Sequence, residues 1–302
     1  MTNSSVLVVD ISQVIIAACV IESKELTDKS NTKNTIKHIA LSTLLSLKRK
    51  FNPFKIYIAC DSKNYWRTTE FSYYKGHRKH AKEVGFLDWS AIAESIDEVK
   101  FDLKENFPFT VIEVEGAEAD DVIAFVCKHY QENNLVNKGL IEEPRDIIIV
   151  STDKDFQQLQ KYENVKQWNN IQKKMITCSN PKHFLVEHIA HGDTGDNIPS
   201  IVNDNNWAKC RAENISTRAK PFKSTRLKDF HEKGIDACLN DEERKNWKRN
   251  ETLVNLDMVP EHINNKIHDE MISYEIKSSK VKIMNYFIKN RMKLLLGSAS
   301  EF

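Results

Sequence analysis

Four short apolar runs, separated by segments of helical periodicity, constrain the fold of this chain more than any other feature of its sequence. The runs cover residues 6–9, 55–59, 110–114 and 146–150. Their nearly uninterrupted apolar character is typical of strands buried on both faces. Between them, apolar residues recur at helical spacing over 36–47 and 92–103, and a third helix is expected to begin at Glu118. This alternation predicts an α/β fold with a mainly parallel sheet flanked by helices.

Toward the C-terminal end the pattern changes. The strand-like runs fade, and helical spacing appears over residues 184–191, 245–256 and 281–296. The stretch 203–228 contains Pro221 and few apolar residues in register, so long loops are expected there. We therefore expect two units, an α/β domain over residues 1–185 and a smaller α-helical region over residues 186–302.

Composition places the chain among soluble globular proteins. Apolar residues make up 40% and charged residues 29% of its 302 residues, the balance of a folded, helix-rich protein. The run 6–9 follows the N-terminus directly, without the basic start and cleavage site of a signal peptide. The six cysteines are scattered singly, which indicates reduced, mostly structural thiols. These features predict a protein that works inside a cell and not in a membrane.

The net charge of +1 conceals two basic segments. Residues 63–82 contain six Lys or Arg against one acid, and residues 209–228 contain seven against one. Over residues 65–80 aromatic side chains are mixed with the cations, a combination suited to stacking on bases and neutralising phosphates. The alternative is an amphipathic helix whose aromatic residues pack on the sheet, namely Trp66, Phe71 and Tyr74.

Acidic residues follow the apolar runs at the points where the strands should end. Asp10 follows the first run, Asp61 lies two residues after the second, and Asp153 and Asp155 lie just beyond the fourth. Ligands of open α/β sheets bind outside the carboxyl ends of the strands. We therefore expect these carboxylates to converge at that edge of the sheet.

Two further acidic groups add to this cluster. One contains Glu118, Asp120 and Asp121, and the other contains Asp193 and Asp196. Unit charges about 4 Å apart interact by roughly 4 kcal/mol at an effective dielectric of 20, so such carboxylates stay ionised together only when cations bind. Two Mg²⁺ ions can flank the attacking and leaving oxygens of an in-line phosphoryl displacement. The cluster predicts magnesium-dependent hydrolysis of phosphodiester bonds.

Each acid taken singly has a structural alternative, because an acid after a strand is often only a helix cap or a turn residue. Asp10 and Asp61 are weak signals by themselves. Asp153 with Asp155, and the group at 118–121, are more specific because neighbouring acids repel. The joint occurrence of these groups favours a metal site over capping.

The order of the motifs carries a resemblance to a known family. Asp10 and Asp61 come first, followed by the basic aromatic segment. The later motifs are E-A-D-D at 118–121, S-T-D-K-D-F-Q-Q-L at 151–159, G-D at 192–193 and D-N-I-P at 196–199. With these motifs the chain resembles the flap endonuclease or 5′-nuclease family over nearly its whole length. The resemblance implies a PIN-like domain over residues 1–185 and a helical, duplex-binding region over residues 186–302.

The activity that this resemblance implies is that of a magnesium-dependent 5′-nuclease. Such an enzyme cuts at 5′ ends and flaps of RNA–DNA hybrids and duplex DNA by two-metal-ion catalysis. Its role would be the removal of lagging-strand RNA primers in phage DNA replication, in the cytoplasm of the infected bacterial host. The implied partners are these nucleic acids, a single-stranded-DNA-binding protein and a sliding clamp, with a monomer as the default.

The resemblance also implies a set of metal-binding residues for two Mg²⁺ ions, with Mn²⁺ as a substitute. The first ion would lie among Asp10, Asp61, Asp120 and Asp153. The second would be served, directly or through water, by Glu118, Asp155, Asp193 and Asp196. Two roles are open for Asp121. It either supports the metal ligands from outside or serves as a helix-start residue.

Basic residues are assigned to the nucleic acid. Lys75 and Arg78 match the family's catalytic basic pair near the scissile phosphate, where they would stabilise charge that develops in the transition state. Nucleic-acid contacts are expected from Arg67, Tyr74, Lys209 and Arg211.

One departure from the family concerns residues 200–205. After the D-N-I-P motif many members carry a glycine-rich helix-hairpin-helix that grips the duplex backbone, whereas this segment contains no glycine. A standard hairpin, with any monovalent ion it holds, is therefore not expected. The basic residues within 209–228 either replace its phosphate contacts or form a solvated loop.

Rival functions fit the motifs less well. A haloacid-dehalogenase-like phosphatase would need a second Asp two residues after Asp10, where Ser12 stands. A small PIN-type ribonuclease would lack the helical last third and the Asp193/Asp196 pair. The alternative from another class is a non-catalytic protein that recognises duplex ends and binds metal, although no acid of the set has been replaced by a neutral residue.

Overall fold

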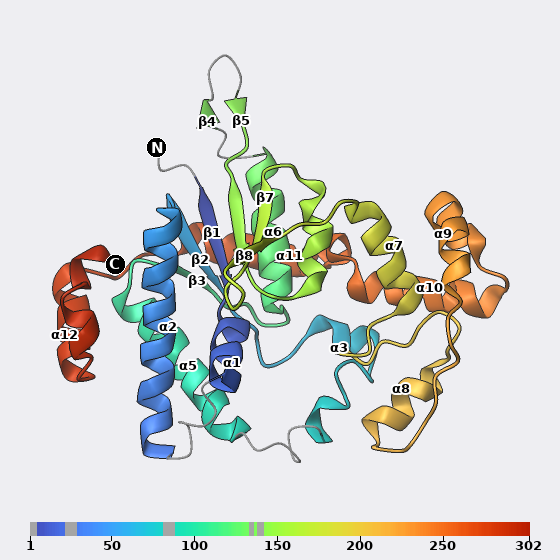
Figure 1. The fold of residues 1–302 in the computed structure, drawn as a ribbon, viewed down its shortest axis with the longest axis horizontal. Helices are drawn as coiled ribbons and strands as arrows, with labels where there is room; N and C mark the ends of the chain where they lie inside the picture. Colours follow the sequence, from blue (N-terminus) through green and yellow to red (C-terminus); the bar gives the residue numbers. More distant parts are fainter. Residues whose placement is uncertain (1–4, 22–28, 81–87, 133–135, 138–141) are drawn as a thin grey trace.

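A six-stranded sheet with helices on both faces forms the centre of the computed structural model, which describes residues 5–21, 29–80, 88–132, 136–137 and 142–302 (Figure 1). The strand order is β3-β2-β1-β6-β7-β8. These strands are β1 (Val6–Asp10), β2 (Lys55–Ala59), β3 (Thr110–Ile112), β6 (Ile147–Val150), β7 (Val165–Asn169) and β8 (Lys174–Ile176). Neighbours pair in parallel except β8, which is antiparallel to β7. The expected α/β fold is therefore confirmed.

The four predicted strands are confirmed as β1, β2, β3 and β6. Every residue of β1 and β6 is buried, as expected for central parallel strands. The pattern did not predict β7 and β8, because polar Lys166 and Gln167 interrupt the apolar residues of β7 and β8 is largely exposed. Backbone pairing with β6 holds β7 in place, with Val165 opposite Ile147. A separate short pair joins β4 (Val136–Asn137) to β5 (Glu142–Glu143).

Helices account for most of the remaining structure. They are α1 (Ile11–Ile21), α2 (Lys29–Phe51), α3 (Trp66–Glu70), α5 (Trp89–Asn106), α6 (Ala119–Glu132), α7 (Pro181–His191), α8 (Asn205–Ala212), α9 (Leu227–Lys233), α10 (Asp241–Val254), α11 (Glu261–Ser273), α12 (Lys280–Lys289) and α13 (Lys293–Leu296). The predicted helices of the first part are confirmed as α2, α5 and α6. The pattern did not predict α1, because its residues are almost all apolar and show no helical spacing. Among the described residues, no helix is long and apolar enough to span a membrane.

One expectation for the C-terminal third needs correction. Residues 281–296 do not form one helix, because α12 ends at Lys289 and α13 begins at Lys293. Between them Arg291 adopts a left-handed φ of 55°, which no continuous α-helix allows. Helical spacing on both sides of the break hides it in the sequence.

The other C-terminal expectations agree with the structure. The helices expected at 184–191 and 245–256 are α7 and α10, although α10 begins earlier, where the Asn240 side chain accepts a hydrogen bond from Glu243 N. The basic stretch 203–228 contains the irregular residues 215–223, together with helix α8 before them.

Three hydrophobic cores hold these elements together. Alternate residues of β1 pack on one side with α1, α2, α5 and α12, and on the other side with α6 and α11. A third core contains residues of the helices α7, α8, α9 and α10, together with Phe71 and Tyr74. Residues from Leu256 onward contribute to the two sheet cores, and Phe302 is buried in the first of them. The division between residues 185 and 186 stays a prediction.

Candidate active site

A cavity of about 450 Å³ lies at the carboxyl edge of the sheet, beyond the ends of β1, β2 and β6. Its polar lining consists chiefly of five carboxylates and two cations, namely Asp10, Asp61, Asp120, Asp153 and Asp196 with Lys75 and Arg78. An apolar wall is formed by Ile16, Ala17 and Val20 of α1, with Ile171 from the turn between β7 and β8. The parallel topology thus brings acids from distant parts of the sequence into one place.

Backbone contacts fix the carboxylates that follow the strands. Asp10, the last residue of β1, accepts a hydrogen bond from Gln13 N at 3.0 Å. Asp61 accepts one from Ala119 N at 3.0 Å, and Asp153 caps the 3₁₀-helix Lys154–Lys161. These three residues therefore do both: they accept backbone hydrogen bonds, as the capping alternative predicted, and they line the cavity.

Mutual repulsion among these carboxylates perturbs their protonation. Burial and the charges of Asp61 and Asp153 raise the pKa of Asp10 to about 7. Burial and the charge of Asp153 hold the pKa of Asp120 well above its usual value. In the described part of the chain, no Lys or Arg forms an ion pair with Asp10, Asp61, Asp120 or Asp153. An all-oxygen donor set without ion-pair partners suits a hard divalent cation such as Mg²⁺, and no three of these carboxylates place oxygens within 4.8 Å of one another before such an ion binds.

Glu118 is buried beside the cavity and does not line it. Its carboxylate accepts hydrogen bonds from Arg67 Nη1 at 2.7 Å, Lys75 Nζ at 2.5 Å and the Tyr74 hydroxyl at 3.1 Å. Both of its oxygens are therefore engaged by donors of the chain itself. In this arrangement Glu118 holds Lys75 at the edge of the cavity.

Arg67 belongs to the same buried ion network. Its side chain is 2% exposed, and its Nη1 lies 2.8 Å from Asp121 Oδ1. Asp121 also accepts hydrogen bonds from Trp66 Nε1 at 3.0 Å and from Glu118 N at 2.9 Å, so its position is a buried helix start away from the cavity. The contact between Arg67 and nucleic acid that the basic aromatic segment predicted is not supported, because the Arg67 side chain has almost no exposed surface in this structure. The same holds for Tyr74, which is 5% exposed.

The aromatic part of the basic segment packs inside the protein. Trp66 lies in the core formed with α6 and α11, and Phe71 and Tyr74 lie in the core of α7 to α10. The alternative interpretation therefore holds for Trp66, whereas Phe71 and Tyr74 lie after the end of α3 and pack away from the sheet. The segment's last cation, Lys82, lies outside the described residues.

The two cations of the cavity are tied to Asp196. Arg78 Nη2 lies 2.5 Å from Asp196 Oδ1, and Lys75 N donates to Asp196 O at 2.8 Å from a backbone with φ of 53°. Burial lowers the pKa of Lys75, but the nearby charges of Glu118 and Asp196 more than offset this and raise it, so the ammonium group stays protonated. The cavity therefore combines permanent positive charge with a cluster of acids.

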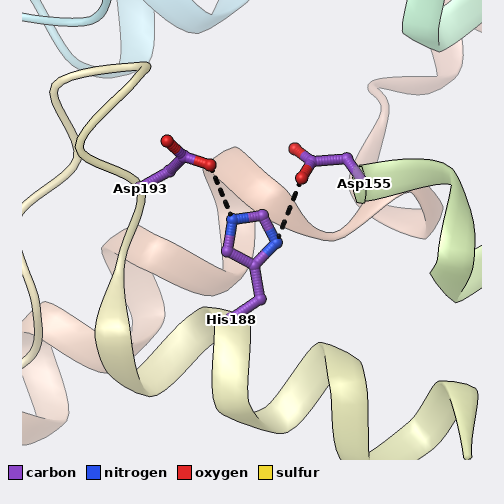
Figure 2. Close-up of side chains that lie close together, drawn as sticks. All are labelled: Asp155, His188 and Asp193. Atoms are coloured by element: carbon purple, nitrogen blue, oxygen red, sulfur yellow. Dashed lines mark hydrogen bonds and ion pairs between the residues drawn. The ribbon is translucent and has the colours of Figure 1, made fainter. Parts of the chain in front are cut away.

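Asp155 and Asp193 meet at a histidine instead of at the cavity. Figure 2 shows the His188 imidazole between them, with Nε2 3.0 Å from Asp193 Oδ2 and Nδ1 3.5 Å from Asp155 Oδ1. Burial raises the pKa of Asp155 to about 7. Burial also raises the pKa of Asp193, but hydrogen bonds from His188 and Lys154 outweigh it and hold that pKa below its usual value. Ligand atoms of the three residues in Figure 2 all lie within 4.8 Å of one another.

Sequence reasoning did not single out His188. It lies in the last turn of α7, five residues before Asp193, and the chain must reverse for the two to meet. Gly192 makes this turn with a φ of 66°, and an added Cβ would lie 2.4 Å from Ile198 O. The G-D motif was therefore the one available signal, since its glycine permits the reversal.

Lys209 and Arg211 both lie on α8 but in different surroundings. The Lys209 side chain is 48% exposed, with Glu213 at 4.0 Å. Arg211 donates to Thr194 O at 2.9 Å and to Asn197 Oδ1 at 3.2 Å. Arg211 therefore braces the loop that carries Asp193 and Asp196, whereas Lys209 points toward solvent.

Asparagine side chains of α10 hold the glycine-free segment 200–205. Asn246 Nδ2 donates to Ile201 O at 2.9 Å and to Asn203 O at 3.1 Å. Asn250 Nδ2 donates to Pro199 O at 2.9 Å. These backbone carbonyls are thus satisfied by amides of the chain itself, which is how the segment keeps its shape without glycine.

Matches to family models agree with this fold. A model of the 5′-3′ exonuclease N-terminal resolvase-like domain matches residues 5–188, and a model of the T4 RNase H C-terminal region matches residues 180–302. The chain belongs to the 5′-3′ exonuclease family.

The chain is also similar to individual proteins of known name. It is 27% identical to ribonuclease H of Enterobacteria phage T4 over 307 residues, which cover 99% of this chain and 96% of that protein. It is 33% identical to flap endonuclease Xni of Shewanella woodyi over 144 residues, 45% of this chain and 49% of that protein. Among solved structures, the bacteriophage T5 D15 protein crystallised with metal ions covers 89% of this chain with a TM-score of 0.59 and 17% identity, a likeness of fold. A T5 D15 flap endonuclease complex with DNA and metal ions matches equally well, at 18% identity.

Proposed function

We propose that this protein is a magnesium-dependent 5′-nuclease that hydrolyses phosphodiester bonds at 5′ ends and flaps of RNA–DNA hybrids and duplex DNA. The observation that carries the proposal is the cavity at the carboxyl edge of the sheet, where five carboxylates lie beside Lys75 and Arg78. Divalent cations and fixed positive charge both stabilise the negative charge that develops during phosphodiester hydrolysis. The names of the relatives support the same reaction class.

Two Mg²⁺ ions, for which Mn²⁺ can substitute, would occupy this region. Asp10, Asp61, Asp120 and Asp153 would hold the first ion. Asp196, with Asp155, Asp193 and Glu118 directly or through water, would serve the second. When bound, such ions stabilise negative charge on the attacking and leaving oxygens of an in-line displacement.

The chain's own cations would act on the phosphate itself. Lys75 is held by Glu118, and Arg78 is held by Asp196, so both side chains are already oriented when substrate enters. Their charge would stabilise the phosphoryl oxygens as negative charge develops, an effect for which removal of one donor typically costs about 10²–10³ in rate. The apolar wall of α1 and Ile171 would limit water access beside the reacting group.

The duplex would lie along the exposed cations beyond the cavity, with Lys209 of α8 among its contacts. The helical region, residues 186–302, would then serve duplex binding. Following the family resemblance of its motifs, we propose that the protein removes lagging-strand RNA primers in the cytoplasm of an infected bacterium as a monomer. A single-stranded-DNA-binding protein and a sliding clamp are the proposed partners.

The test follows cleavage of a nicked duplex, a 5′-flap duplex and an RNA–DNA hybrid, labelled separately at each end, with Mg²⁺ or a chelator. Short 5′-labelled products that require Mg²⁺ and vanish in Asp120→Asn are expected. Binding of these substrates without cleavage under every condition would refute the catalytic proposal and favour the alternative, a non-catalytic protein that recognises duplex ends and binds metal.

A further inference from the structure

The His188 imidazole is positioned as a candidate ligand within the second acidic group. It is 6% exposed and comes from α7, while Asp155 comes from the 3₁₀-helix Lys154–Lys161 and Asp193 from the loop after α7 (Figure 2). Its two nitrogens face two different carboxylates. The two contacts differ in kind.

On the Asp193 side the contact is a complete hydrogen bond of 3.0 Å between Nε2 and Oδ2. Asp193 is itself fixed, because Lys154 Nζ lies 2.9 Å from Oδ2 while Gly195 N donates to Oδ1 at 2.7 Å. A carboxylate anchored in this way fixes the orientation of the imidazole ring. It also places a proton on Nε2, so that the ring, once it loses its Nδ1 proton to a bound cation, would present the Nδ1 lone pair on the Asp155 side.

On the Asp155 side the geometry leaves two buried atoms without a hydrogen bond. His188 Nδ1 and Asp155 Oδ1 are both inaccessible to solvent and make no hydrogen bond in the structure. They lie 3.5 Å apart, beyond the usual 2.7–3.2 Å of an N–H···O bond. Two ligands about 2.1 Å from a shared cation at a near-tetrahedral angle lie roughly 3.4 Å apart.

We propose that His188 Nδ1 and Asp155 Oδ1 bind one divalent transition-metal ion, with Asp193 acting through the imidazole as the carboxylate that orients it. A metal-ligating histidine commonly donates its other ring N–H to a carboxylate in this way. Imidazole suits Fe²⁺, Ni²⁺ and Zn²⁺ best, Mn²⁺ binds the same site more weakly, and Mg²⁺ prefers oxygen ligands. The site at His188 and Asp155 would thus prefer a transition metal, while the all-oxygen cavity accepts Mg²⁺. This inference rests on the proposed function and refines its metal requirement.

Nitrogen coordination can be measured without catalysis. Mn²⁺ is added to the metal-free full chain, and electron spin-echo spectroscopy detects coupling of its unpaired electrons to an imidazole nitrogen. The wild type should show this coupling, which should change when histidine is labelled with ¹⁵N. His188→Asn should lose the coupling and bind Mn²⁺ at least about 10-fold more weakly at one position, with a smaller change for Mg²⁺. The matched control is His191→Ala, an exposed histidine of the same helix, which should change neither quantity.

The outcomes separate this inference from the proposed function. Absence of nitrogen coupling in the wild type at Mn²⁺ concentrations that fill both positions would overturn it and leave His188 as a bridge between two carboxylates. Coupling that persists in a folded His188→Asn protein would also overturn it. If that variant does not fold, the wild-type spectrum still decides when His231→Ala, which removes the neighbouring pair His183 and His231, retains the coupling. Nuclease activity with Mg²⁺ in the absence of nitrogen coupling would refute this inference alone, whereas failure to bind any divalent ion would refute both.

Discussion

Lys75 Nζ lies 2.5 Å from Glu118 Oε1, although Lys75 also lines the cavity and Glu118 is 1% exposed. One ion pair therefore connects the buried network around Arg67 with the candidate active site. Because Glu118 also accepts hydrogen bonds from Arg67 and Tyr74, it stays paired if Lys75 is lost. Catalysis and stability can thus be separated by substituting different members of this network.

Lys75→Met should remove catalysis while preserving the fold. The substitution keeps the apolar stem but loses the charge that would act on the phosphate, so we expect the single-turnover rate to fall by about 10²–10³. Lys79→Met, an exposed cation of the same segment, is the control and should retain the rate. Equal rates in the two variants would show that Lys75 does not act on the phosphate.

Arg67→Met should destabilise the protein. The variant would leave Glu118 and Asp121 buried with less compensating charge, and breaking a buried pair in this way typically costs about 3–5 kcal/mol of unfolding free energy. Urea unfolding of the metal-free protein measures the effect. The exposed Arg218→Met is the matched control, with an expected change within about 0.5 kcal/mol. A loss of duplex affinity without a loss of stability would instead support contact between Arg67 and nucleic acid.

Stability of the metal-free protein should fall as pH rises. The folded-state pKa values of Asp10 and Asp155 are raised from 3.8 to about 7, so between these values the folded chain binds more protons than the unfolded chain. Unfolding free energy therefore decreases with pH in this window. Asp10→Asn should reduce the slope and be more stable than wild type at pH 8 in chelator, by on the order of 2 kcal/mol.

Added Mg²⁺ should remove most of that advantage, because the cation neutralises the same charges. The melting temperature at pH 5 and pH 8, in chelator and in Mg²⁺, gives the four values needed. The exposed Asp229→Asn serves as the control. An Asp10→Asn advantage that is equal with and without Mg²⁺ would argue against a cation beside Asp10.

Lys209→Ala should weaken duplex binding without changing the rate at which bound substrate is cleaved. One phosphate contact fewer lowers the slope of log affinity against log salt concentration by about 1. Lys289→Ala is the control, because α12 lies at the opposite end of the molecule from α8 (Figure 1). An unchanged salt slope would indicate that the basic stretch is a solvated loop.

Chain direction and side-chain periodicity were sufficient to predict the sheet and its acidic edge. Buried parallel strands need nearly continuous apolar residues, and their carboxyl ends must share one edge. The sequence therefore predicts that Asp10, Asp61 and Asp153 lie together. The polar strand β7 and the break at Arg291 could not be predicted, because backbone pairing and a single left-handed residue leave no trace in the apolar pattern.

The sequence by itself determined which residues carry charge and which strands they follow, since both depend on local composition and spacing. Tertiary structure alone decided how those charges are used. Arg67 turns inward to Glu118 and Asp121, and His188 stands between Asp155 and Asp193. The physical reason is that the partner of a buried charge is set by packing between elements far apart in the chain, where desolvation makes an unpaired charge too costly.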